Sequence, residues 1–183
     1  MTQKPATYAD LEALPPDKVG ELIGGELYAS PRPTLAHGWA ATELAGELRG
    51  LFGRGRGGPG GWRFIIEPEL HLADDVLVPD VAGWRRERMP TVPEGVGAKV
   101  APDWLCEVLS PSTAALDRDR KMTVYAREGV RHVWLVDPKA RSLEAFRLES
   151  TRYVRLETWT GEATVRAEPF EALALELHVL WAD

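Results

Sequence analysis

Two acidic residues occupy positions where the surrounding sequence predicts apolar strands. Glu107 interrupts "WLCEVL" (104–109), and Asp80 stands between apolar residues in "VLVPDVAGW" (76–84). A buried charge costs several kcal/mol unless it is paired, protonated or bound to a metal. If the two strands are neighbours, the carboxylates could face one another and bind a divalent cation such as Mg²⁺, which prefers carboxylate oxygen and water. The alternative is that each acid pairs with an arginine or caps a backbone group.

A helix is expected after Glu107, and three of its polar residues recur at intervals of four. Asp117, Lys121 and Tyr125 therefore share one face of that helix. The spacing alone favours an exposed Asp117–Lys121 pair that contributes a few tenths of a kcal/mol. In the other interpretation, Lys121 points back at the carboxylates, where an ammonium group could orient an attacking water or stabilise a transition state.

Two further residues are weaker candidates. Glu69, with Glu67 beside it, could supply another metal ligand, although a solvated strand face is the simpler interpretation. His37 stands at the start of an expected helix, where a histidine is more often a hydrogen-bonded structural residue than a catalytic one.

The charge and composition narrow the class of protein. A net charge of −6 over 183 residues argues against a general polyanion binder, but it does not exclude a metal-dependent nucleic-acid enzyme. Arginines without any acid gather between Leu48 and Ile66, and those considered as phosphate contacts are Arg54, Arg56 and Arg63. No P-loop, dinucleotide fingerprint or Gly-x-Ser-x-Gly elbow occurs.

The location expected from the sequence is the cytoplasm. A single cysteine, Cys106, cannot form an internal disulfide, which suits a reducing compartment. No apolar run approaches the length of a signal core or a membrane span, so no membrane association is expected.

The expected elements place these residues in a single domain over residues 1–183, of the α/β or α+β class with a mixed sheet. Turn residues and apolar periodicity predict the following elements: a hairpin over 20–30 about Gly24-Gly25, a helix over 34–52, a glycine-rich loop over 53–61, two strands in 62–84 joined at 73–75, a strand over 104–109, a helix from Ser112 or Thr113 to about Glu128, a strand over 130–137, and a hairpin over 142–159.

Asp80 in a "PD" pair, followed by Glu107 on a later strand and then a helix, resembles the PD-(D/E)xK nuclease superfamily. More closely, the chain resembles the Uma-type family of bacterial restriction endonucleases. The segments that carry this resemblance are "GELIGGELYASPRPTLAH", "VLVPDV", "APDWLCEVLSPSTAALDRDRKMTVYAREGVRHVWLVDP" and "FEALALELHVLW". The resemblance implies a restriction-endonuclease-like fold, in which helices flank a central mixed sheet.

The resemblance also implies roles for particular residues. Asp80 matches the metal-binding aspartate, and Glu107 matches the second acid. The superfamily's lysine would fall at Leu109, which is a departure, and Lys121 matches the lysine that the family retains on the helix, with Asp117 and Tyr125 as its companions. A second departure is Gly24-Gly25 where the family usually has Asp-Gly, from which we expect a looser turn without loss of the site.

The implied activity is hydrolysis of DNA phosphodiester bonds by an endonuclease that depends on Mg²⁺ or Mn²⁺, which Asp80 and Glu107 would hold. Enzymes that cut both strands are commonly homodimers, although nothing in this sequence shows an interface. The main alternative is a non-catalytic nucleic-acid-binding or regulatory protein that retains the fold, and a weaker one is a hydrolase of another phosphoester.

Overall fold

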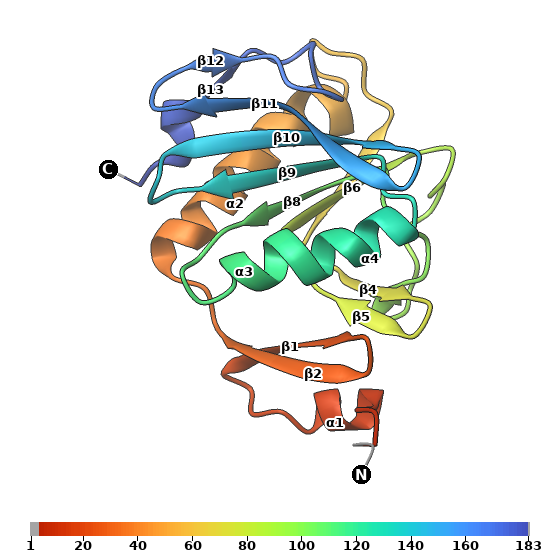
Figure 1. The fold of residues 1–183 in the computed structure, drawn as a ribbon. Coiled ribbons are helices and arrows are strands. Elements are labelled where there is room, and N and C mark those ends of the chain that lie inside the picture. The colour runs from red at the N-terminus through yellow and green to blue at the C-terminus, as the bar shows by residue number, and fades with distance from the viewer. Residues whose placement is uncertain (1–3, 183) are drawn as a thin grey trace.

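A six-stranded mixed sheet forms the centre of the computed structural model, which describes residues 4–182 (Figure 1). Its strands lie in the order β11-β10-β9-β8-β6-β3. β8 and β9 are parallel, and all other neighbours are antiparallel. The bounds are β3 (Trp62–Ile66), β6 (Val81–Arg85), β8 (Trp104–Val108), β9 (His132–Asp137), β10 (Ser142–Glu149) and β11 (Arg152–Thr160).

Helices cover both faces of this sheet (Figure 1). On one face lies α2 (Leu35–Leu48), which continues into a π-helical turn, η1 (Arg49–Gly53). On the other face lies a continuous helical segment made of α3 (Ala114–Leu116), the π-helical turn η2 (Asp117–Lys121) and α4 (Met122–Arg127). Because both faces are covered, all five residues of β8 are buried.

The side chains of β8 alternate between these two layers. Trp104, Cys106 and Val108 pack in the apolar cluster that contains the buried residues of α2. Leu105 packs in the second cluster, with Val124 and Tyr125 of α4. The alternation therefore points Glu107 toward α4 and away from α2.

A smaller five-stranded sheet, ordered β2-β1-β5-β4-β7, lies beside the central one. Its bounds are β1 (Lys18–Ile23), β2 (Glu26–Pro31), β4 (Glu69–Leu72), β5 (Asp75–Leu77) and β7 (Gly97–Ala98). β1 and β2 form the predicted hairpin, and both Gly24 and Gly25 have positive φ angles of 60° and 78°, which residues other than glycine rarely adopt.

The remaining elements are short. They are α1 (Tyr8–Glu12), β12 (Thr164–Val165), β13 (Leu175–Glu176) and the 3₁₀ helix η3 (Leu177–Leu180). Within residues 4–182, none of the helices has the length and apolar character needed to cross a membrane.

One part of the predicted secondary structure is wrong. Residues 62–85 form four short strands, β3, β4, β5 and β6, instead of two. The predicted turn lies between β4 and β5, but the chain also breaks at Glu67-Pro68 and before Val81. Glu67 has a φ of 47°, and Pro68 and Pro79 have no backbone N–H to donate to a strand ladder.

Candidate active site

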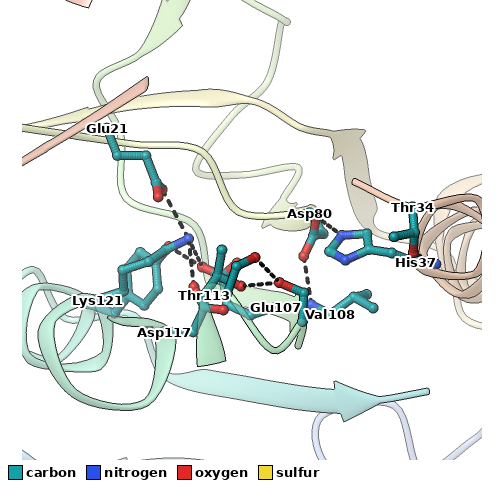
Figure 2. A network of polar contacts seen from close by, with 12 residues as sticks. Glu21, Thr34, His37, Asp80, Glu107, Val108, Thr113, Asp117 and Lys121 are labelled. Carbon is teal, nitrogen blue, oxygen red and sulfur yellow. Dashed lines mark hydrogen bonds and ion pairs between the residues drawn. The ribbon is translucent and has the colours of Figure 1, made fainter. Parts of the chain in front are cut away.

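The ammonium group of Lys121 lies at the centre of a buried cluster of carboxylates (Figure 2). Its Nζ is 2.8 Å from Glu107 Oε1, 3.0 Å from Glu21 Oε1 and 3.3 Å from Asp117 Oδ1. The Lys121 side chain is only 3% exposed. The interpretation of Asp117 and Lys121 as an exposed surface pair is therefore wrong, because Lys121 points at the carboxylates.

Three separate elements bring this cluster together. Glu107 comes from β8, Glu21 from β1, and both Asp117 and Lys121 from η2. Tyr125, one turn further along the helix, donates its hydroxyl hydrogen to Glu107 Oε1 at 2.5 Å. π-Helical turns are rare and are found often at functional sites, and this one carries two members of the cluster.

The cluster contains three carboxylates and one ammonium group. Burial raises the pKa of Glu107 well above its ordinary value, and Lys121 opposes this effect only in part. Burial also raises the pKa of Asp117. Although burial acts to lower the pKa of Lys121, the carboxylates of Glu107 and Glu21 raise it well above its ordinary value, so the ammonium group keeps its proton. The excess of negative charge favours uptake of a proton or of a further cation.

Asp80 lies beside this cluster, immediately before β6. The strand register pairs Val81 with Cys106, which places Asp80 next to the end of β8. Its Oδ2 accepts a hydrogen bond from the backbone N–H of Val108 at 2.6 Å, and its Oδ1 is 2.6 Å from His37 Nε2. The two acids predicted to lie on neighbouring strands are therefore adjacent across the β6–β8 pair.

His37 holds Asp80 from the first turn of α2 (Figure 2). Thr34 caps this helix by accepting a hydrogen bond from the His37 backbone N–H at 3.3 Å. The other ring nitrogen, Nδ1, is buried and makes no hydrogen bond to any residue in the described range 4–182. Asp80 is thus the polar partner that fixes the position of this ring.

These residues line one pocket with a volume of about 240 Å³. Its wall includes Glu21, His37, Asp80, Glu107, Asp117 and Lys121. The loop that follows β8 contributes hydroxyl groups from Ser110, Ser112 and Thr113. Tyr125 lies behind Glu107, and it is fully buried.

Glu69 is not brought to this pocket. Its Oε1 accepts hydrogen bonds from Tyr8 Oη at 2.7 Å and is 2.6 Å from His71 Nε2. Glu69 lines a separate, larger pocket. A direct role beside Asp80 and Glu107 has no support from this arrangement.

The three arginines considered as phosphate contacts lie away from the pocket. Arg63 donates hydrogen bonds to the backbone carbonyl oxygens of Met89 and Pro90, so it has a structural role in holding that loop. Arg54 and Arg56 are exposed and follow the C-terminal end of η1. At a rise of about 1.5 Å per residue, Arg54 lies about 25 Å along the helix axis from His37.

The donor atoms of Asp80 and Glu107 fit a magnesium ion. Both are hard carboxylate oxygens on the wall of one pocket, and Mg²⁺ usually binds to one or two carboxylates together with water and substrate phosphate. Both contacts of Glu107 described above are made by Oε1. In the described part of the chain no group of three or more metal-ligating side chains is assembled.

Glu21 is a member of the cluster that sequence reasoning missed. It is 6% exposed and also accepts a hydrogen bond from the backbone N–H of Val78 at 2.8 Å, which ties β1 to the segment before Asp80. The signal was available, because Glu21 precedes Leu22 and Ile23 in a strand, as Glu107 interrupts β8. The Gly24-Gly25 turn that follows Glu21 is the stronger local signal in that stretch.

Comparisons with known proteins agree with this fold. The sequence model of the Uma2 family, described as "putative restriction endonuclease", matches residues 5–179. A crystal structure of a putative nuclease belonging to DUF820 from Anabaena variabilis ATCC 29413 is similar to this chain, with a TM-score of 0.76 and 23% sequence identity. The match covers 97% of this chain and 98% of that chain, and at this identity it shows the shared fold. The comparison with curated proteins gave no match.

Proposed function

We propose that this chain, which belongs to the Uma2 family of putative restriction endonucleases, is a Mg²⁺-dependent endonuclease that hydrolyses phosphodiester bonds in DNA. One observation carries the proposal: the buried Lys121 contacts Glu107 in a pocket that Asp80 also lines. A buried charge cluster of this kind is often less stable than well-packed apolar residues of similar volume. A stability role therefore explains the cluster poorly, which supports a role in chemistry.

Asp80 and Glu107 would hold the magnesium ion, or a manganese ion in its place. When bound there, the metal supplies a Lewis acid for the phosphoryl oxygen and a more acidic bound water. Lys121 keeps its proton at Nζ and would stabilise the negative charge that develops on the phosphoryl oxygens. These three residues are the proposed catalytic residues.

The neighbouring side chains act through these three. Tyr125 fixes Glu107 by donating to Oε1, and His37 fixes Asp80 at Oδ1. Asp117 and Glu21 hold the Lys121 ammonium group from two further sides. Because the side chains come from β1, α2, β8 and the helical segment 114–127, the pocket is held by rigid elements on several sides.

Contacts with the nucleic-acid backbone are proposed for Arg54 and Arg56. Both are exposed, and both lie at the start of the glycine-rich loop between η1 and β3. Their distance from the pocket means that they would bind phosphates several nucleotides away from the cleaved bond. Such contacts position the substrate without reading its sequence.

The test of the proposed function is cleavage of DNA with and without Mg²⁺ by the wild-type protein and by Asp80→Asn. Asparagine keeps the size of the side chain and loses the charge, so we expect cleavage to be abolished while the melting temperature changes little. The matched control is Asp74→Asn, because Asp74 is exposed in the β4–β5 turn. This variant should cleave DNA as the wild type does. Equal cleavage by Asp80→Asn and wild type would refute the assignment.

A non-catalytic relative that binds nucleic acid is the second candidate. The observation that favours it is Leu109, which is 6% exposed and stands where the superfamily has its lysine. For such a protein, the wild type would bind DNA but would not cleave it with Mg²⁺ or Mn²⁺. Asp80→Asn would then change stability or binding alone.

A further inference from the structure

A larger pocket of about 630 Å³ opens beside the candidate active site. Its walls include the end of α1, the segment that follows it and the loop before β7, and they are mainly aliphatic, as at Leu11, Leu14, Val92 and Val96. Val19, Arg32, Glu67 and Val78 line both this pocket and the active-site pocket, so the two pockets adjoin. We call the larger pocket the side groove.

The volume of the side groove suits a small organic group. Pockets for such groups measure roughly 300–1,000 Å³ and are mostly apolar with a few polar groups. The active-site pocket, at about 240 Å³, is smaller than this range. A nucleotide bound at the active site could therefore place its phosphate in the small pocket and its base in the side groove.

The charges along the groove match that orientation. Arg32 stands at the junction of the two pockets, and its Nε and Nη2 donate to the Pro16 carbonyl oxygen at 3.1 and 2.8 Å. Since that acceptor is neutral, the contact leaves the positive charge of the guanidinium available to a phosphate. Glu69 lines the groove and Glu67 stands with Arg32 at the junction, and their negative charge favours a neutral group that donates hydrogen bonds.

Glu67 has an unusual backbone at this junction. Its φ of 47° lies in the left-handed region, which costs a non-glycine residue about 1 kcal/mol or more. Its backbone N–H donates to the Asp80 carbonyl oxygen at 3.0 Å, so the strained residue is joined directly to the segment that carries the metal-binding aspartate. Strain of this kind persists where the surrounding structure enforces it, and it is concentrated at functional sites.

We propose that the side groove accepts one unpaired base of the substrate strand, and that Glu67 selects a base with an exocyclic amino group. This inference rests on the proposed nuclease function and names its substrate class as single-stranded or locally unpaired DNA. Arg32 would bind the phosphate next to the inserted base. Glutamate accepts a hydrogen bond from the N4 amino group of cytosine, whereas thymine has no amino group to donate. Removing a base from the helical stack is least costly where the strand is already unpaired.

The first experiment measures binding of oligo(dC) and oligo(dT) of equal length by fluorescence anisotropy, in a chelating buffer that prevents cleavage. Both are pyrimidine strands that stack weakly. They differ at the base edge, where cytosine has the N4 amino group and thymine has O4, an N3–H and a C5 methyl group, so Glu67→Met is needed to assign any preference to the carboxylate. We expect oligo(dC) to bind about fivefold more tightly to the wild type, because only cytosine can donate an amino hydrogen to the Glu67 carboxylate. In Glu67→Met, which keeps an unbranched side chain without an acceptor, this preference should disappear.

The second experiment fills the groove. Val96 is 84% exposed and lines the groove, so Val96→Trp adds bulk there without disturbing the core. The matched control is Val154→Trp, at a position on β11 that is 43% exposed and distant in the fold. We expect Val96→Trp to weaken binding of oligo(dC) about tenfold and Val154→Trp to leave it unchanged.

The outcomes separate this inference from the proposed function. If Val96→Trp binds oligo(dC) as tightly as the wild type does, or if the wild type binds neither strand or binds both equally, the side groove does not accept an amino-bearing base. If the binding preferences appear but the wild type cleaves no DNA with Mg²⁺, the groove assignment stands and the nuclease assignment fails. If the wild type cleaves DNA with Mg²⁺ but shows no such binding preferences, the nuclease assignment stands and the groove assignment fails.

Discussion

Replacement of Glu107 by glutamine should stabilise the protein at neutral pH. Glutamine has nearly the same shape, and its carbonyl oxygen can accept the hydrogen bonds that Tyr125 and Lys121 now make to Glu107 Oε1. The substitution therefore removes one negative charge and little else. Because Glu21 and Asp117 still surround Lys121, the ammonium group keeps two carboxylate partners.

The pH dependence gives the sign of this effect. The folded state raises the pKa of Glu107 above its value in the unfolded chain, so the folded state binds this proton more readily. The stability that Glu107 contributes is complete below the unfolded pKa of about 4.3 and is lost as the pH rises through the folded pKa. Glutamine does not titrate, so the variant and the wild type should diverge as the pH rises above this range.

The size of the effect follows from the burial of the cluster. Glu107 is 2% exposed, and replacing a whole buried ion pair by well-packed apolar residues is often neutral or stabilising by about 1–4 kcal/mol. Here only the surplus negative charge is removed, because Lys121 keeps Glu21 and Asp117 as partners. We expect a gain of about 1–3 kcal/mol at neutral pH in the absence of metal. For a domain of this size each kcal/mol raises the melting temperature by about 2–4 °C.

The assay is urea or thermal unfolding of both proteins across the pH range, in a chelating buffer and then with Mg²⁺. Magnesium should raise the melting temperature of the wild type and not that of Glu107→Gln. Asp103→Asn is the matched control, because Asp103 is also buried but forms an ion pair with Arg88 at 2.8 Å. This variant loses the charge of a paired carboxylate, so the protein should become less stable. A loss of stability in Glu107→Gln at neutral pH would show that the cluster carries no excess negative charge, and the argument for a cation site would fail.

Three further variants test the same cluster and the proposed DNA contacts. Lys121→Met leaves three buried carboxylates without a counter-ion, so the free energy of unfolding at neutral pH should fall by about 3–5 kcal/mol, measured by urea unfolding. Part of this stability should return as the pH falls, because the carboxylates take up protons. Tyr125→Phe removes one hydrogen bond to a charged acceptor and should cost about 1–3 kcal/mol in the same assay, with cleavage slowed less than in Asp80→Asn. The double variant Arg54→Ala, Arg56→Ala should reduce the slope of log K against log [salt] for duplex DNA by about 2, while cleavage at saturating DNA is unchanged.

Local patterns in the sequence predicted much of the secondary structure. The hairpin about Gly24-Gly25, the helix that begins near Thr34 and the helix that ends before Gly129 are all confirmed. Each depends on a local signal, namely two glycines that allow positive φ, a side chain that caps a helix, or a glycine that ends one. The apolar pattern in 62–85 predicted two strands where the structure has four. Prolines and the left-handed backbone of Glu67 interrupt strands that the pattern alone indicates as continuous.

The candidate site was predicted in part for a similar reason. The sequence indicated Asp80 and Glu107 because a carboxylate in an apolar strand needs a partner. A role for Lys121 beside them came from the resemblance to nucleases. Spacing alone favoured a surface position for Lys121, since an interval of four residues gives a helix face but not the direction in which that face points. That residues 1–183 form one domain stays a prediction.

The sequence by itself determined the local elements and the presence of costly charges within apolar strands, because those depend on neighbouring residues. Only the tertiary structure decided which charges meet. Glu21 joins Lys121 because the second sheet, which contains β1, packs beside η2, and Arg63 reaches the carbonyls of Met89 and Pro90 in the loop after β6. These contacts join residues 26 to 100 positions apart, and the packing of strands and helices that brings them together is not encoded in any single stretch of the chain.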